Sequence, residues 1–137
     1  MEPWKQMLSL GFTRKIPISP LDMIPFNLPK TKAVVLKVDV EGFELEVFRG
    51  AEQFISKVSP ALLFEVLPHF NDTILIEKQR MLFHWLVSHG YTTYNIDHKA
   101  RRSLVSNGFL DNITDFERTD FLAVNNQGVY QVATKLN

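Results

Sequence analysis

Four side chains that can take part in acid–base chemistry stand where two predicted strands end. Asp39 and Glu41 follow the apolar run AVVLKV, while Glu65 and His69 lie at and after the end of the run ALLFEV. Ligands of open α/β sheets bind beyond the carboxyl ends of the strands, so these four are the candidate catalytic residues. A carboxylate there can bind a ribose hydroxyl or a metal, or accept a substrate proton. The alternative is structural: Asp39 or Glu41 caps the following helix, and His69 is a surface residue.

Other chemistries are disfavoured. His84 and His89 are five residues apart, unlike the i, i+3 or i+4 spacing of a helical metal pair, and the chain has no cysteine, so we predict no metal site. Lys99, Arg101 and Arg102 form a basic cluster, which is either a contact for an anionic substrate or a solvated loop. Lys and Arg together number 15, as do Asp and Glu. This balance argues against a nucleic-acid partner, which normally requires a basic excess.

Alternating strand and helix patterns position the candidate residues. Helical spacing begins after Gly42, with a bend or split at Gly50, and a second, longer helix is capped by Asn71 or Asp72 and ends before Gly90. The stretch HKARRSLVSNG is predicted to be a surface connection. Four segments rich in β-branched and apolar residues predict strands: Ala33–Val40, Ala61–Val66, Tyr91–Asp97 and Thr119–Asn125, with VYQVA extending or pairing with the last.

This order predicts an α/β fold of three layers, with a mostly parallel sheet and an antiparallel last strand, because no helix separates the last two strands. The 137 residues suffice for one domain. Five of the seven prolines lie in residues 1–30, so that segment is predicted to be partly irregular, with at most a short helix near Glu2–Leu10 and another turn near Leu21–Met23. Residues 31–137 form the α/β domain.

One long segment, residues 34–66, resembles the central signature of the FkbM-type methyltransferases. In that family an apolar strand ends Lys-apolar-Asp-apolar-Glu-Gly, a helix of the type Glu-x-x-apolar-x-x-Gly-Ala follows, and after a proline comes a strand ending in Glu. Upstream, Ile16–Ile24 resembles the family's short segment that often contains Leu-Asp. The signature is carried by Lys37, Asp39, Glu41, Gly42, Glu44, Val47, Gly50, Ala51, Pro60 and Glu65.

The resemblance implies S-adenosylmethionine-dependent O-methyl transfer on the seven-stranded, Rossmann-like class I methyltransferase fold, with Asp39 and Glu41 lining the cleft. The family's Gly-rich cofactor loop has no counterpart, because Gly11 is the only glycine before Gly42. The resemblance therefore implies the C-terminal half only, strands four to seven, with the N-terminal cofactor-binding half missing. The cofactor-binding residues are unknown, and we expect little or no S-adenosylmethionine binding by this chain.

Two functions remain open. The chain is a methyltransferase-family domain that is inactive alone, or it is a non-catalytic half-domain that binds a partner. The acceptor is a glycan, a lipid or another small molecule. Without its neighbouring strand, the apolar segment Ala33–Val40 would have a bare edge, so we expect either that residues 1–30 cover it or that the chain self-associates there. No run is long enough to span a membrane, and no signal peptide or cysteine is evident, so a cytoplasmic location is the default.

Overall fold

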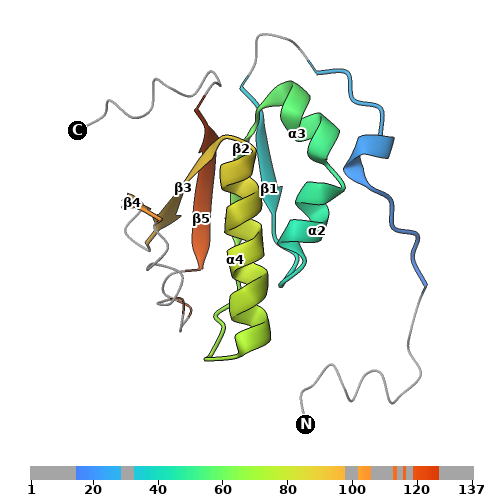
Figure 1. The fold of residues 1–137 in the computed structure, drawn as a ribbon. Helices are drawn as coiled ribbons and strands as arrows, with labels where there is room; N and C mark the ends of the chain where they lie inside the picture. The colour runs from blue at the N-terminus through green and yellow to red at the C-terminus, as the bar shows by residue number, and fades with distance from the viewer. Residues whose placement is uncertain are drawn as a thin grey trace.

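Strands and helices alternate along the chain in a computed structural model that describes residues 15–28, 33–97, 102–105, 113, 116 and 119–126. The expected α/β class is confirmed (Figure 1). The elements are the 3-10 helix η1 (Leu21–Met23), β1 (Val35–Val38), α2 (Glu44–Arg49), α3 (Glu52–Val58), β2 (Ala61–Glu65), α4 (Thr73–Ser88), β3 (Tyr91–Ile96), β4 (Arg102–Leu104) and β5 (Asp120–Asn125).

The five strands form one mixed sheet in the order β1-β2-β5-β3-β4. β1 and β2 are adjacent and parallel, as predicted, with Val35 opposite Ala61 and Val38 opposite Phe64. The other three pairings, β2–β5, β3–β5 and β3–β4, are antiparallel. The prediction of a mostly parallel sheet was therefore wrong. The strands β1, β2 and β3 share one direction, but β5, before which the described residues form no α-helix, inserts antiparallel between β2 and β3.

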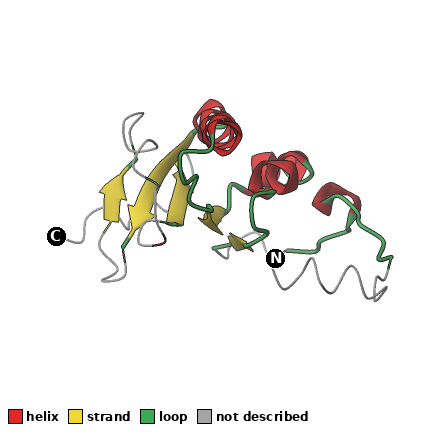
Figure 2. Cartoon of the chain, turned by 90° about the horizontal axis from the view of Figure 1, so that it is seen from below, coloured by secondary structure: helices red, strands yellow, loops and turns green. Residues whose placement is uncertain are grey.

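The helices α2, α3 and α4 all cover the same face of the sheet (Figure 2). Side chains of β2 alternate accordingly: Leu62 and Phe64 are buried under the helices, whereas Leu63 and Glu65 on the other face are only half-buried. On the edge strand β1, Val35 is 61% exposed. The described residues therefore form two layers rather than the expected three, and we call the uncovered side the open face.

The α2–α3 region is split at Gly50, as predicted, and Asp22 holds the split in place. Both carboxylate oxygens of Asp22 accept hydrogen bonds from the N-terminus of α3, from the Gln53 N–H at 2.9 Å and the Phe54 N–H at 2.8 Å. The Asp22 N–H in turn donates to the Gly50 carbonyl oxygen at 3.0 Å. A Cβ at Gly50 would lie 3.4 Å from Pro20, so glycine allows this close approach. Asp22 of the Leu-Asp segment thus caps the N-terminus of α3, although it lies about 30 residues earlier in the sequence.

The long helix α4 begins and ends as predicted. The Asp72 carboxylate accepts from the N–H groups of Ile74 and Leu75, which makes Asp72 the cap rather than Asn71. At the other end, Gly90 has a φ of +78°, which a residue with a Cβ rarely adopts. The hydrophobic core between α4 and the sheet combines aliphatic side chains with aromatic rings, among them Phe64 and Phe121, which stack with their ring centroids 5.6 Å apart.

Strand β4 was not expected, because the sequence around it was predicted to be a surface connection. Its three residues pair with the end of β3 and are too few and too polar to give a strand pattern. The predicted helix near Glu2–Leu10 and the VYQVA strand lie outside the described residues. In the part of the chain that the structure describes, no helix combines the length and apolar character that a membrane span needs.

Candidate functional site

Three carboxylates form a row at the carboxyl edge of the sheet. Glu65 of β2 pairs in register with Asp120 of β5. On β1, Val38 pairs with Phe64 of β2. The next residues, Asp39 and Glu65, therefore occupy corresponding positions at the ends of the two strands. The alternation of side chains places all three on the open face of the sheet. We call Asp39, Glu65 and Asp120 the acidic row.

Glu65 and Asp120 form the close type of antiparallel pair. The Val66 N–H donates to the Thr119 carbonyl oxygen at 2.8 Å, so Val66 and Thr119 are a hydrogen-bonded pair. Because the two kinds of pair alternate along an antiparallel ladder, the adjacent pair, Glu65 and Asp120, is a non-hydrogen-bonded pair. The Cα atoms of such pairs are about 4.5 Å apart, and their side chains are neighbours. Like charges directly opposite each other destabilise a sheet by roughly 0.2–1 kcal/mol. Stability does not explain this arrangement, whereas residues that break local rules are typical of functional sites.

The turn that follows β1 is strained and presents Glu41 to solvent. Glu41 has a φ of +50° and Gly42 a φ of +99°. The left-handed region costs an L-residue about 1–2 kcal/mol, and glycine avoids that cost. The turn is held by Glu44, which is 4% exposed and whose carboxylate accepts from the Gly42 N–H at 3.0 Å. Glu44 therefore fixes the turn that carries Glu41.

Neither Asp39 nor Glu41 caps the following helix. α2 has Phe43 as its N-cap residue, and no side chain makes a capping hydrogen bond there. The carboxylate of Asp39 instead lies 3.4 Å from the ammonium group of Lys37, which is two residues earlier, on β1. Helix capping, the structural alternative for these two carboxylates, is therefore not observed. Both are exposed at the edge, where they can meet a ligand.

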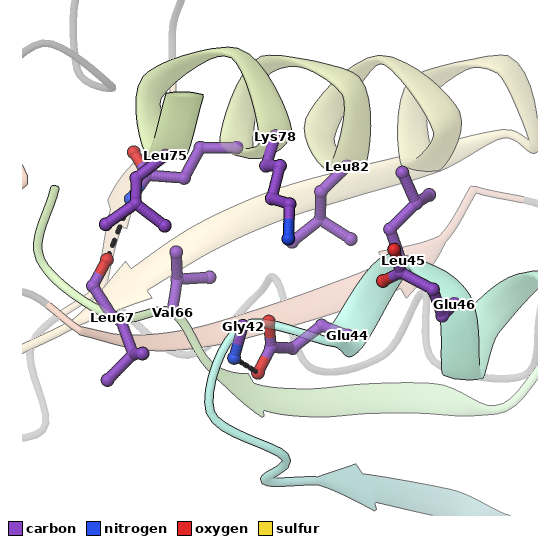
Figure 3. A pocket seen from close by; sticks show the side chains of 10 residues that line it. Gly42, Glu44, Leu45, Glu46, Val66, Leu67, Leu75, Lys78 and Leu82 are labelled. Atoms are coloured by element: carbon purple, nitrogen blue, oxygen red, sulfur yellow. Dashed lines mark hydrogen bonds between the residues drawn. The ribbon is translucent and has the colours of Figure 1, made fainter. Parts of the chain in front are cut away.

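A cavity of about 30 Å³ lies behind this turn, between α2 and α4 (Figure 3). Gln79, 5% exposed, donates from Nε2 to the Leu67 carbonyl oxygen at 2.7 Å, as the dashed line in Figure 3 marks. The Gln79 Oε1 atom is buried without a partner among the described residues. The cavity has room for water, which can donate to that oxygen. Apolar side chains such as Leu75 and Leu82 form much of the remaining wall.

His69 is neither a surface residue nor paired with Glu65. It is 2% exposed, and its N–H donates to the Ile113 carbonyl oxygen at 3.0 Å. Its Nδ1 accepts from the Asn71 N–H at 2.9 Å, which places the proton of the neutral ring on Nε2. Nε2 is buried without a partner in the described part of the chain. His69 therefore shapes the connection from β2 to α4, and neither of its ring nitrogens bonds to Glu65.

The remaining candidates differ in where they lie. His89 lies at the other end of α4, where its Nε2 is 3.1 Å from the Glu52 carboxylate. Lys99 and Arg101 lie outside the described residues, whereas Arg102 begins β4 and pairs with Ile96 at the end of β3, so its backbone lies at the same edge as the acidic row. Within residues that the structure describes, no group of three His, Cys, Asp or Glu side chains could hold a metal ion. Asp120 was missed by sequence reasoning, because only the strand register places it opposite Glu65.

Comparison with known proteins gives one match. The model of the methyltransferase FkbM domain matches residues 8–93, more than half of the 137 residues. The matched region runs from before η1 into β3 and contains Asp39, Glu41, Glu65 and His69. No curated protein and no solved structure matches. With the signature on β1, α2 and β2 in place, the chain belongs to the FkbM methyltransferase family.

Proposed function

We propose that this chain carries the acceptor side of an S-adenosylmethionine-dependent O-methyltransferase fold and is inactive on its own. The observation that carries the proposal is the acidic row: Asp39, Glu65 and Asp120 lie side by side at the carboxyl edge of a family domain. Ionised carboxylates only accept hydrogen bonds, so the row suits an acceptor molecule with hydroxyl groups. A carboxylate within hydrogen-bond reach of a hydroxyl can orient it and take its proton.

The strand arrangement supports the assignment to strands four to seven of the class I fold. β1 and β2 are parallel and joined through helices, and β5, the last described strand, runs antiparallel. In this proposal β1 is the fourth strand of the complete sheet. Its outer edge has no partner among the described residues, and the first half of the sheet would attach there.

Two pockets that the described residues form do not suit S-adenosylmethionine. Pockets for molecules of that size are usually about 300–1,000 Å³. The cavity between α2 and α4 is about 30 Å³ and is bordered by Glu44, Leu75 and Leu82. A wider depression of about 660 Å³ lies beside η1 at the other end of the sheet, with charged Arg49 and Lys57 in its lining. Neither offers a Gly-rich turn of the kind that lets the backbone approach this cofactor.

We therefore expect no measurable binding of S-adenosylmethionine to the full chain. The measurement is isothermal titration calorimetry, with S-adenosylhomocysteine as the second ligand because it lacks the transferred methyl group. The expected result is that neither ligand gives more than the heat of dilution. Binding of either ligand with a micromolar dissociation constant would contradict the proposed division of the fold. The cofactor site would then have to be found within this chain.

A second candidate function, a non-catalytic interaction module, is favoured by the edge strand β1. Val35 is 61% exposed, Lys37 is the only charge within the strand, and residues 15–28 do not pair with it. An exposed edge of this kind associates with other strands. We expect the full chain to self-associate with rising concentration, and Val35→Lys to keep it monomeric. Size-exclusion chromatography with light scattering measures both; a wild-type chain that is monomeric throughout refutes association through this edge.

A further inference from the structure

Two phenylalanines from distant parts of the sequence pack together at the carboxyl edge while remaining largely in solvent. Phe70, in the connection from β2 to α4, is 61% exposed, and Phe116 is 67% exposed. Their ring centroids are 5.8 Å apart, and the ring planes are inclined by 61°. Single exposed apolar residues are common on protein surfaces, but a paired aromatic corner is a more specific feature. We call Phe70 and Phe116 the aromatic corner.

The backbone pays a conformational cost to hold one half of this corner. Phe70 has a φ of +45° and Asn71 a φ of +65°, both in the left-handed region. Asparagine tolerates that region, but a bulky residue such as phenylalanine is rarely found there. Because Phe70 is exposed, burial of its ring recovers little of that cost. Strain of this kind is concentrated at ligand-binding sites.

The connection is nevertheless rigidly held. Asn71 donates its N–H to His69 Nδ1 at 2.9 Å, and the Asp72 N–H donates to the His69 carbonyl oxygen at 2.7 Å. His69 is itself buried and bonded to the Ile113 carbonyl oxygen, and Pro68 is fully buried. The backbone on both sides of Phe70 is therefore held in place by these bonds. A preformed aromatic surface loses little entropy when a ligand binds.

The aromatic corner lies close to the acidic row. The Thr119 hydroxyl group donates a hydrogen bond to the Phe116 carbonyl oxygen at 3.4 Å. Thr119 directly precedes Asp120 in the sequence. On the other side, Phe70 follows Glu65 by five residues along the connection from β2. Figure 1 places this connection and the start of β5 at the same end of the sheet. Apolar ring surfaces and hydrogen-bond acceptors thus occur at one edge.

This combination matches the chemistry of a hydroxylated ring. A pyranose has an apolar face of C–H groups, which can pack against an aromatic ring, and hydroxyl groups around its rim, which can donate to carboxylates. An alkyl chain would leave Glu65 and Asp120 without partners, and a phosphorylated or acidic sugar would be repelled by them. We propose that the aromatic corner and the Glu65–Asp120 pair bind an uncharged sugar ring. That this sugar is the methyl acceptor rests on the proposed function.

The test is an NMR titration of the full-length, 15N-labelled chain with methyl glycosides of glucose, galactose, mannose and rhamnose, without S-adenosylmethionine. We expect saturable shifts of the Phe70 and Phe116 amide signals with at least one glycoside, at millimolar affinity. Phe70→Ala and Phe116→Ala should each weaken binding about fivefold, since an aromatic contact contributes about 1 kcal/mol. Phe70→Trp should retain binding, and glucose 6-phosphate should bind more weakly than the neutral glycosides.

The matched control is Phe43→Ala, because Phe43 is a similarly exposed phenylalanine, 59%, on the turn after β1. It should bind the glycoside as the wild type does. Absence of saturable shifts with every glycoside, or an equal loss in Phe43→Ala, would overturn the inference. The spectra of the variants also report whether each is folded. The NMR titration contains no cofactor, so its failure would refute sugar binding without bearing on the calorimetric test of the proposed function. Likewise, binding of S-adenosylmethionine in the calorimeter would contradict the proposed function without bearing on sugar binding.

Discussion

Replacing Phe48 with alanine should destabilise the fold by about 3–5 kcal/mol, the cost usual for emptying a buried aromatic site. Phe48 is fully buried and joins three elements. Its ring meets Phe64 of β2 edge to face, with centroids 5.5 Å apart, and stacks on Trp85 of α4 at 5.8 Å. Domains of this size are stable by roughly 5–15 kcal/mol, so the loss is a large share of the total.

Urea denaturation followed by circular dichroism measures this change. Phe43→Ala is the control, because Phe43 is 59% exposed; its ring lies 5.3 Å from the Lys78 ammonium group, so its loss should lower the unfolding free energy by no more than about 1 kcal/mol. Phe48→Leu should fall between the wild type and the alanine variant. A loss below about 1 kcal/mol for Phe48→Ala would mean that α2 does not pack between β2 and α4 as described.

Replacing Asp22 with alanine should lower the unfolding free energy by about 1–2 kcal/mol, because the N–H groups of Gln53 and Phe54 lose their acceptor. Asp22→Asn retains one side-chain oxygen and should lose about half as much. Ser19→Ala is the matched control, since the Ser19 hydroxyl makes only an exposed contact of 3.4 Å with the Pro20 carbonyl oxygen. The same urea titrations measure all three. Equal stability of Asp22→Ala and the wild type would contradict the assignment of Asp22 as the cap of α3.

Local signals in the sequence predicted the elements well. The apolar runs around β1 and β2 and the parallel pairing of these strands were predicted, because a helix-length connection between two buried runs leaves little choice. The division of the helical region at Gly50 and the end of α4 at Gly90 were predicted for similar reasons. In each case the information lies within a few residues of the feature.

Long-range contacts could not be predicted in this way. The insertion of β5 between β2 and β3 depends on strand pairing, which leaves no local pattern. The bond from Asp22 to the start of α3 spans 31 residues to Gln53, and sequence reasoning recognised the segment only by resemblance. The candidate site was predicted in part for the same reason. Glu65 was found at its strand end, but its neighbour Asp120 is visible only once the register is known.

His69 illustrates a different difficulty. A histidine beside a proline in a polar connection is usually exposed, yet this ring is buried and supports the Phe70–Asn71 turn. The strain at Phe70 has no sequence signature either, because phenylalanine is not a residue that the left-handed region favours. The features that distinguish this edge are therefore those in which tertiary structure overrides local preference.

The central claim is that Glu65 and Asp120 are like-charged neighbours at the open edge of the sheet, and a double-mutant cycle tests it most directly. Urea denaturation at low ionic strength is measured for the wild type, Glu65→Gln, Asp120→Asn and the double variant. Each single variant should raise the unfolding free energy by roughly 0.5 kcal/mol, and the double variant should gain little more, because either change removes the repulsion. Unchanged or lowered stability in the single variants, or gains that simply add, would contradict the pairing of these two carboxylates.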